Sequence, residues 1–78
     1  MRTDLRRTVG ARLRAMREAQ GLSQEAVAER AGLHRNYVGS VERGERDIGL
    51  TSLALLVTAL GGSLAEFFAF HRRIRPKR

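Results

Sequence analysis

Apolar residues recur along this chain at helical spacing, and glycines interrupt the pattern at short intervals. The first apolar run steps by four, four and three residues, which is the spacing of one buried stripe on a helix. Its members are Leu5, Val9, Leu13 and Met16. Gly21 ends this predicted helix, Ser23 is a favourable N-cap for a second, and Gly32 ends the second after about two turns.

Gly32 stands between the second predicted helix and a third, which carries Val38 and Val41 on one face. Two helices that meet at a wide angle across a short turn bring their backbones close together, and the turn residue usually needs a positive φ. Glycine allows both, and the small Ala28 lies four residues before it, where the two helices would cross. The pattern therefore predicts a helix-turn-helix over about residues 24–43.

Two more short helices are predicted after the helix-turn-helix. Thr51 or Ser52 is suited to cap a fourth helix, whose apolar side continues to a pair of glycines. Ser63 and Glu66 have the spacing of a capping box, so a fifth helix begins directly after Ser63. No segment alternates apolar and polar residues long enough to predict a strand. The expected fold class is therefore all-α, a bundle of five helices.

The length and charge of the chain predict one small domain with an anionic partner. Seventy-eight residues are enough for a single modest core, which we expect over residues 1–70, followed by a basic tail over 71–78. Fifteen Lys and Arg against eight Asp and Glu give a net charge of +7. Such a charge favours polyanions, with nucleic acid as the first candidate and an anionic membrane surface as the second.

Several function classes are excluded by residues that the chain does not have. It has no cysteine, which excludes a disulfide scaffold and a cysteine-based zinc site and is what a reducing cytoplasm permits. Its two histidines stand apart from other metal ligands, and no carboxylate cluster or phosphate-binding loop is present. The longest apolar stretch is too short for a bilayer span, and the N-terminal segment has no uninterrupted apolar region for a signal peptide. We therefore expect a cytoplasmic protein that is not an enzyme and has no cofactor and no metal.

Two segments carry a family resemblance. The segment "GLSQEAVAERAGLHRNYVGSVERGER" and the later "TSLALLVTALGGSLAEFF" resemble the Cro/cI-type (XRE-like) helix-turn-helix regulators of bacteria and phages, over roughly Leu13 to Phe68. Within that family, the short length and the "RNYVGSVERGER" segment are most similar to the controller proteins of restriction-modification systems. The resemblance implies a lambda-repressor-like DNA-binding domain that works as a homodimer.

The resemblance also implies that the third helix enters the major groove of DNA while the second lies across the backbone. Carried over by position, the implied base contacts are Arg35, Asn36, Tyr37 and Ser40, and the implied phosphate contacts are Gln24, Arg43 and Arg46. Arg35 can donate two hydrogen bonds to guanine O6 and N7, and Asn36 can pair with adenine N6 and N7. Ser40 is short for a base contact, and Tyr37 is open between touching DNA and packing on the domain.

Four other residues bear on the scaffold. Arg17 and Glu42 match an arginine and a glutamate that form an internal ion pair in family members, linking the first helix to the end of the third. His34 stands where the family usually has a capping Ser, Thr or Asp, so this cap is weaker or supplied otherwise. Gly39 lies inside the third helix and costs about 1 kcal/mol relative to alanine unless close packing requires it.

The last predicted helix, about residues 63–70, carries more apolar surface than one core-facing side needs. It holds all three phenylalanines of the chain, and its large apolar residues are Leu64, Phe67, Phe68 and Phe70. Leu64 and Phe67 can complete the core of the monomer, but the set spreads around the helix. We therefore expect this helix to form a two-fold dimer interface, which would place two third helices about one DNA turn apart on a roughly palindromic site.

Two function hypotheses remain open from the sequence. The first is a sequence-specific transcriptional regulator that binds double-stranded DNA at a roughly palindromic operator as a homodimer, and that blocks or recruits RNA polymerase. The second is the antitoxin of a toxin-antitoxin pair, or a phage-type repressor, whose C-terminal helix or basic tail binds a partner protein such as a toxin. A membrane-binding peptide is disfavoured, because the chain has the caps, corners and core of a folded domain.

Overall fold

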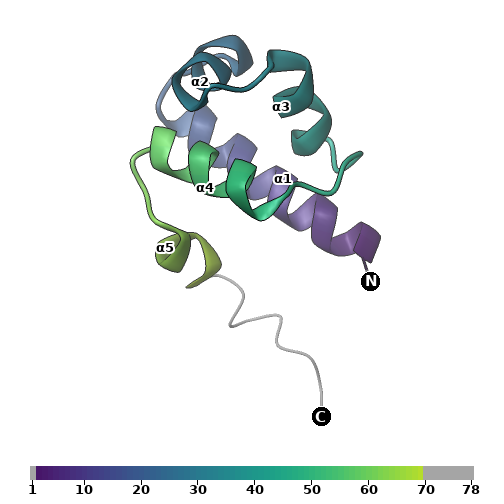
Figure 1. Cartoon of the computed structure of the whole chain (residues 1–78). Coiled ribbons are helices and arrows are strands. Elements are labelled where there is room, and N and C mark those ends of the chain that lie inside the picture. Colours follow the sequence, from purple (N-terminus) through teal and green to yellow (C-terminus); the bar gives the residue numbers. More distant parts are fainter. Residues whose placement is uncertain (1, 70–78) are drawn as a thin grey trace.

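The computed structural model describes residues 2–69, and these fold into five helices (Figure 1). The helices are α1 (Arg2–Ala19), α2 (Gln24–Ala31), α3 (Arg35–Glu42), α4 (Leu50–Ala59) and α5 (Leu64–Phe68). No strand occurs in the described part of the chain, so the predicted all-α fold class is confirmed. Phe70 and the predicted tail over 71–78 lie outside the described residues.

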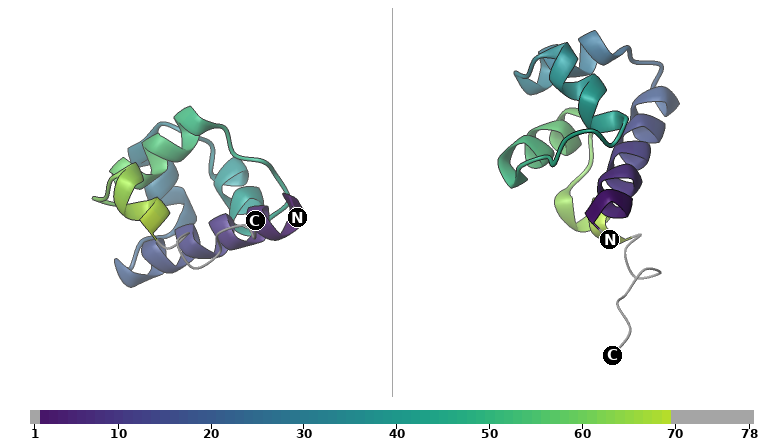
Figure 2. Two further views of the ribbon diagram at one scale, coloured as in Figure 1. Left: turned by 90° about the horizontal axis from the view of Figure 1, so that it is seen from below. Right: turned by 90° about the vertical axis from the view of Figure 1, so that its right-hand side faces the viewer.

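The long helix α1 runs along the molecule, and the shorter helices pack on it and on one another (Figure 1). α3 packs against both α1 and α2, and α4 packs against α2 and α5. The right-hand view of Figure 2 shows α2 at the top of the molecule and α5 at the bottom, with α4 between them. The helix-turn-helix and the last helix therefore present separate surfaces.

Apolar residues from all five helices form the core. They are Val9, Leu13, Val27, Ala28, Ala31, Val38, Val41, Leu53, Leu56, Val57, Leu60 and Phe67. Burying a Val, Leu or Phe side chain stabilises the fold by about 1.5–3 kcal/mol relative to leaving it exposed.

The prediction that Leu5 belongs to the buried stripe of the first helix is wrong, because Leu5 is 47% exposed. Leu5 lies beyond Val9, the first core residue of α1, and lines an open groove instead.

Local hydrogen bonds set where several helices begin and end. Ser23 accepts a bond from the Ala26 N–H at 3.0 Å at the start of α2. Ser63 and Glu66 form the predicted capping box of α5 with two bonds of 3.1 Å. Gly32 ends α2 with a φ of 74°, the left-handed conformation that its corner requires. These features are confirmed as predicted.

The prediction that Thr51 or Ser52 caps α4 is wrong. The helix begins at Leu50, and its N-cap is Gly49, which has extended backbone and makes no side-chain capping bond. Glycine is acceptable at an N-cap, and the earlier start places both hydroxyl residues inside the first turn. His34, the N-cap of α3, also makes no side-chain capping bond, as expected. The starts of α3 and α4 therefore depend on packing rather than on side-chain caps.

Gly10 allows α1 and α3 to approach each other at backbone distance. A Cβ atom at this position would lie 2.8 Å from the carbonyl oxygen of Glu42, and closer still to that of Val41. Glycine inside a helix costs about 0.5–1 kcal/mol relative to alanine, and the close packing of the two helices offsets this cost. The apolar spacing did not reveal this role, because glycine has no side chain to enter the pattern.

The ion pair predicted between Arg17 and Glu42 is present and nearly buried. Arg17 Nε donates to Glu42 Oε2 at 2.7 Å and Nη2 donates to Oε1 at 2.9 Å, with side chains 11% and 3% exposed. Gln24 Nε2 also donates to Glu42 Oε1, at 3.0 Å, and Arg17 Nη1 donates to the carbonyl oxygen of Leu22 at 2.7 Å. The hydrogen bond to Glu42 raises the pKa of Arg17, against the opposing effect of burial. One carboxylate thus joins α1, α2 and α3.

Replacing Arg17 with methionine should destabilise the fold, because Glu42 would keep a buried charge after losing two of its donors. Removing one partner of a buried ion pair costs about 3–5 kcal/mol of the free energy of unfolding. Urea denaturation followed by circular dichroism measures this loss. The double variant Arg17→Met, Glu42→Leu removes both charges and should recover most of the stability. Equal losses in the two proteins would assign the effect to packing instead of the ion pair.

Candidate nucleic-acid interface

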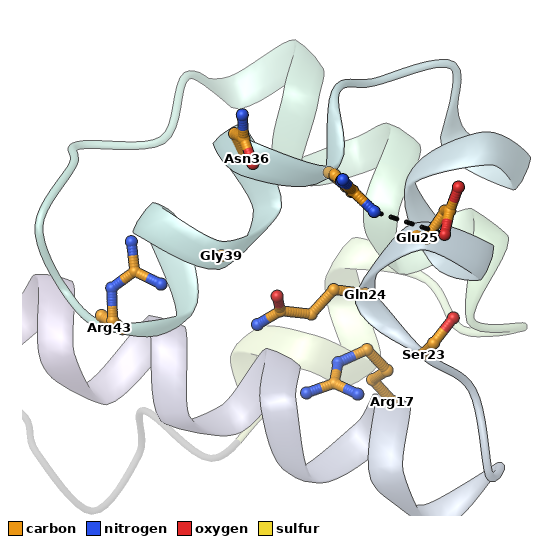
Figure 3. Close-up of a pocket in the computed structure, with 8 residues that line it drawn as sticks. Arg17, Ser23, Gln24, Glu25, Asn36, Gly39 and Arg43 are labelled. Carbon is orange, nitrogen blue, oxygen red and sulfur yellow. Dashed lines mark hydrogen bonds and ion pairs between the residues drawn. The ribbon is translucent and has the colours of Figure 1, made fainter.

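α2 and α3 border a hollow in the surface, termed here the recognition hollow (Figure 3). Its lining includes Gln24, Glu25, Arg35, Asn36, Gly39 and Arg43. The residues at positions 24, 35, 36 and 43 are predicted DNA contacts. The corner between the two helices thus brings predicted base-reading and phosphate-contacting side chains to one surface, although they come from different helices.

Arg35 and Asn36 are exposed on the first turn of α3. Arg35 Nη1 lies 3.5 Å from Glu25 Oε1 on α2, and Figure 3 draws this ion pair as a dashed line. Asn36 projects from α3 at the border of the hollow (Figure 3). Both side chains are therefore accessible to an external partner, and their contact with DNA stays a prediction.

Gln24 begins α2 as predicted, but its amide faces the protein. Its Nε2 donates to Glu42, and the residue is only partly exposed. A Cβ atom at Gly39 would lie 3.2 Å from Gln24 Oε1 and 3.1 Å from Arg43 Nη1. Glycine at this position in α3 therefore makes room for two side chains of the recognition hollow. The close packing around Gly39 therefore explains why a glycine is present inside this helix despite its low helix propensity.

Tyr37, Ser40 and Arg46 form one cluster, although we predicted separate base and phosphate contacts for them. Ser40 Oγ donates to the Tyr37 carbonyl oxygen at 2.8 Å, and Arg46 Nε donates to Ser40 Oγ at 3.3 Å. The Arg46 guanidinium carbon lies 5.4 Å from the centroid of the Tyr37 ring, which is a cation–π distance. The Ser40 hydroxyl therefore serves this cluster, and its geometry gives no support to a base contact.

Arg43 and Glu45 are both exposed and make a two-point contact. Arg43 Nε donates to Glu45 Oε2 at 3.0 Å and Nη2 donates to Oε1 at 3.1 Å. This hydrogen bonding lowers the pKa of Glu45 and raises the pKa of Arg43, so both groups stay charged. Glu45 thus occupies the Nε–Nη2 side of the Arg43 guanidinium.

Sequence reasoning missed the acidic partners of two predicted arginine contacts, Arg35 and Arg43. Glu45 stands two residues after Arg43, and this proximity was a usable signal. Glu25 lies ten residues before Arg35, on another helix, so no local pattern pairs the two. The turn between α2 and α3 creates that contact.

The predicted dimer residues fall into different environments. Phe67 is 1% exposed and belongs to the monomer core, so its assignment to a dimer interface is wrong. Phe68 is 37% exposed and meets the Phe67 ring edge to face, with 5.4 Å between centroids. Leu64 packs partly buried against the core. Phe68 lines an apolar groove together with the exposed Leu5 and Leu50.

Other kinds of site were not found in the described part of the chain. Among the side chains that the structure describes, residues 5–69, no three His, Asp or Glu gather in a way that would hold a metal ion. Over the same residues, no helix combines the length and the apolar character that a bilayer span needs.

This chain is similar in sequence and in structure to known proteins. A family model described as "Helix-turn-helix" matches residues 13–67. The control protein C.SmaI from Serratia marcescens is 44% identical over 63 residues, which cover 81% of this chain and 75% of that protein.

Two solved structures are also similar. The restriction-modification controller protein C.AhdI from Aeromonas hydrophila matches with a TM-score of 0.78 and 48% identity, over 81% of this chain and 96% of that one. The controller protein C.Esp1396I, solved as a tetramer with its natural 35 base-pair operator, matches with a TM-score of 0.81 and 29% identity, over 88% of this chain and 91% of that one. The matched family segment contains α2 and α3 entire, and the chain belongs to the helix-turn-helix family, as its resemblance to the Cro/cI-type (XRE-like) regulators predicted.

Proposed function

We propose that this protein is a transcriptional regulator that binds a specific sequence in double-stranded DNA through α3. The observation that carries the proposal is the exposure of Arg35 and Asn36 on the first turn of α3, beside the recognition hollow. A helix held in this way can place its first residues on base edges in the major groove while the start of α2 meets the backbone. The net charge of +7 adds attraction to the phosphates.

We propose a role for each of the four exposed residues that we predict to contact DNA. Arg35 donates two hydrogen bonds to a guanine, and Asn36 pairs with an adenine. Arg43 and Arg46 bind phosphates, and Tyr37 holds the Arg46 side chain in place. The protein acts in the cytoplasm by occupying an operator and blocking or recruiting RNA polymerase, with no catalytic chemistry and no cofactor.

We also infer that the protein binds DNA as a homodimer on a roughly palindromic operator. The apolar groove supports this, because the exposed Leu5, Leu50 and Phe68 meet there. In a two-fold dimer such a patch meets its own copy and is removed from water. The same arrangement presents one α3 to each half-site.

The narrower role that we propose is that of a restriction-modification controller protein. C.SmaI and C.AhdI, both named as control or controller proteins, are 44% and 48% identical to this chain, and each match covers 81% of it. These relatives favour the controller hypothesis over the antitoxin hypothesis. C.Esp1396I, which was solved on its operator, further supports DNA as the partner.

Replacing Arg35 with alanine should remove the preference for one base pair in each half-site. A good bidentate contact is worth about 1–3 kcal/mol of discrimination against the wrong base. Selection of bound duplexes from a random pool measures the preference at every position. Arg14→Ala is the matched control, because Arg14 is an exposed arginine of α1 that pairs with Glu18. If the selected motif were the same for Arg35→Ala and the wild type, α3 would not be the reading helix in the proposed way.

Replacing Arg46 with alanine should weaken binding to the selected duplex and to a scrambled duplex by similar factors, because phosphate contacts carry no sequence information. The slope of log K against log salt should become shallower by about 1 for each phosphate that the variant no longer neutralises. Fluorescence anisotropy titrations over a salt series measure both quantities. A weakening confined to the selected duplex would assign base reading to Arg46 instead.

Replacing Phe68 with glutamate should convert the dimer to monomers, because a charge would then lie in the apolar groove. Light scattering measures the mass directly. Ala11→Glu, at an exposed position of α1, adds the same charge outside the groove and should leave the dimer intact. If the Phe68→Glu protein stayed dimeric, the dimer interface would not lie in this groove.

A further inference from the structure

The ion pair between Arg35 and Glu25 uses one corner of the Arg35 guanidinium. Arg35 Nη1 lies 3.5 Å from Glu25 Oε1, and the two side chains are 62% and 72% exposed. Among the described side chains, residues 5–69, neither Nε nor Nη2 of Arg35 has a hydrogen-bond partner. A guanidinium has five N–H donors in a rigid planar fork, so a contact at one nitrogen leaves a second pair of donors available.

The second exposed ion pair of this surface has a different geometry. Glu45 engages both Nε and Nη2 of Arg43, at 3.0 and 3.1 Å. That carboxylate occupies the Nε–Nη2 side of Arg43 rather than its Nη1–Nη2 end. Glu25 leaves the equivalent edge of Arg35 open. The two acidic residues therefore engage different sides of their guanidinium groups, and only Arg35 keeps both Nε and Nη2 for another partner.

A carboxylate beside Arg35 also changes which DNA groups attract this arginine. A phosphate carries a full negative charge and is repelled by Glu25, whereas the guanine edge offers neutral acceptors. Because charges within about 8–10 Å interact at physiological salt, the repulsion reaches a phosphate that bonds to Arg35. Glu25 therefore lowers the attraction of Arg35 for the backbone more than its attraction for a base.

We propose that Glu25 is a positioning residue that makes Arg35 a reader of guanine rather than a general phosphate contact. The Glu25 carboxylate on α2 binds the Arg35 guanidinium at Nη1 and leaves the Nε and Nη2 donors of Arg35 for the base. The same carboxylate repels the DNA phosphates. This inference rests on the proposed function, because it assigns a role within the same DNA-binding surface. It makes Glu25 a determinant of specificity although Glu25 itself makes no hydrogen bond to DNA.

The test compares Glu25→Gln with Glu45→Gln and the wild type. Both variants lose one negative charge from an exposed position near the recognition hollow, so they change the net charge equally. Each protein is titrated by fluorescence anisotropy against the duplex selected by the wild type, a set of its single base-pair variants, and a scrambled duplex of the same length. Thermal unfolding followed by circular dichroism checks that the variants fold alike.

Glu25→Gln should bind the scrambled duplex more tightly than the wild type does. The ratio of selected to scrambled affinity should fall by about two- to fivefold, which corresponds to the free energy of an exposed ion pair. The reduced discrimination should lie at the base pair whose preference Arg35→Ala abolishes. Glu45→Gln should strengthen binding to both duplexes by the same factor. In an Arg35→Ala background, Glu25→Gln should leave the remaining base preferences unchanged.

A uniform gain in Glu25→Gln, equal to that of Glu45→Gln on every duplex, would overturn the positioning role and leave Glu25 as a simple charge. Reduced discrimination spread over all base pairs would overturn the positioning role as well.

Failure of the proposed function itself would give a different result. In that case the wild type itself would bind selected and scrambled duplexes equally, whatever residue stands at position 25.

Discussion

The Glu42 carboxylate is the point at which the helices of the recognition surface are joined. It accepts two hydrogen bonds from Arg17 on α1 and one from Gln24 on α2, while its own backbone belongs to α3. A buried charge is tolerated only when such donors are in place, so the three helices are bound to one geometry. Gly10 makes this geometry possible, because it lets α1 reach the backbone of α3.

A scaffold joined in this way leaves the outer side of α3 for recognition. The residues that hold the helix point inward, and Arg35 and Asn36 stand exposed on its first turn. The surface is not simply basic, because two of its arginines are held by exposed carboxylates, at Glu25 and Glu45. Acidic residues on a DNA-binding surface weaken its general attraction to phosphates. They can therefore increase the share of affinity that depends on base contacts.

The candidate site was predictable to different degrees at different residues. Arg35 and Asn36 follow from their places in a recognisable helix-turn-helix, and the structure leaves both accessible. The Ser40 hydroxyl is instead bonded to its own helix and to Arg46. The apolar pattern allowed Phe67 a place in the core but did not decide it, because which face of a short helix is buried depends on the helix that covers it.

Local sequence was sufficient for the all-α class, the corner at Gly32 and the capping box at Ser63. These features depend on residues within about one turn of each other, where spacing and backbone preference decide the outcome. The pairing of Glu25 with Arg35 and the exposure of Leu5 needed the folded chain. Both depend on how separate helices are oriented, and that orientation comes from core packing and from the buried Glu42 carboxylate, which bring together residues that no local pattern relates.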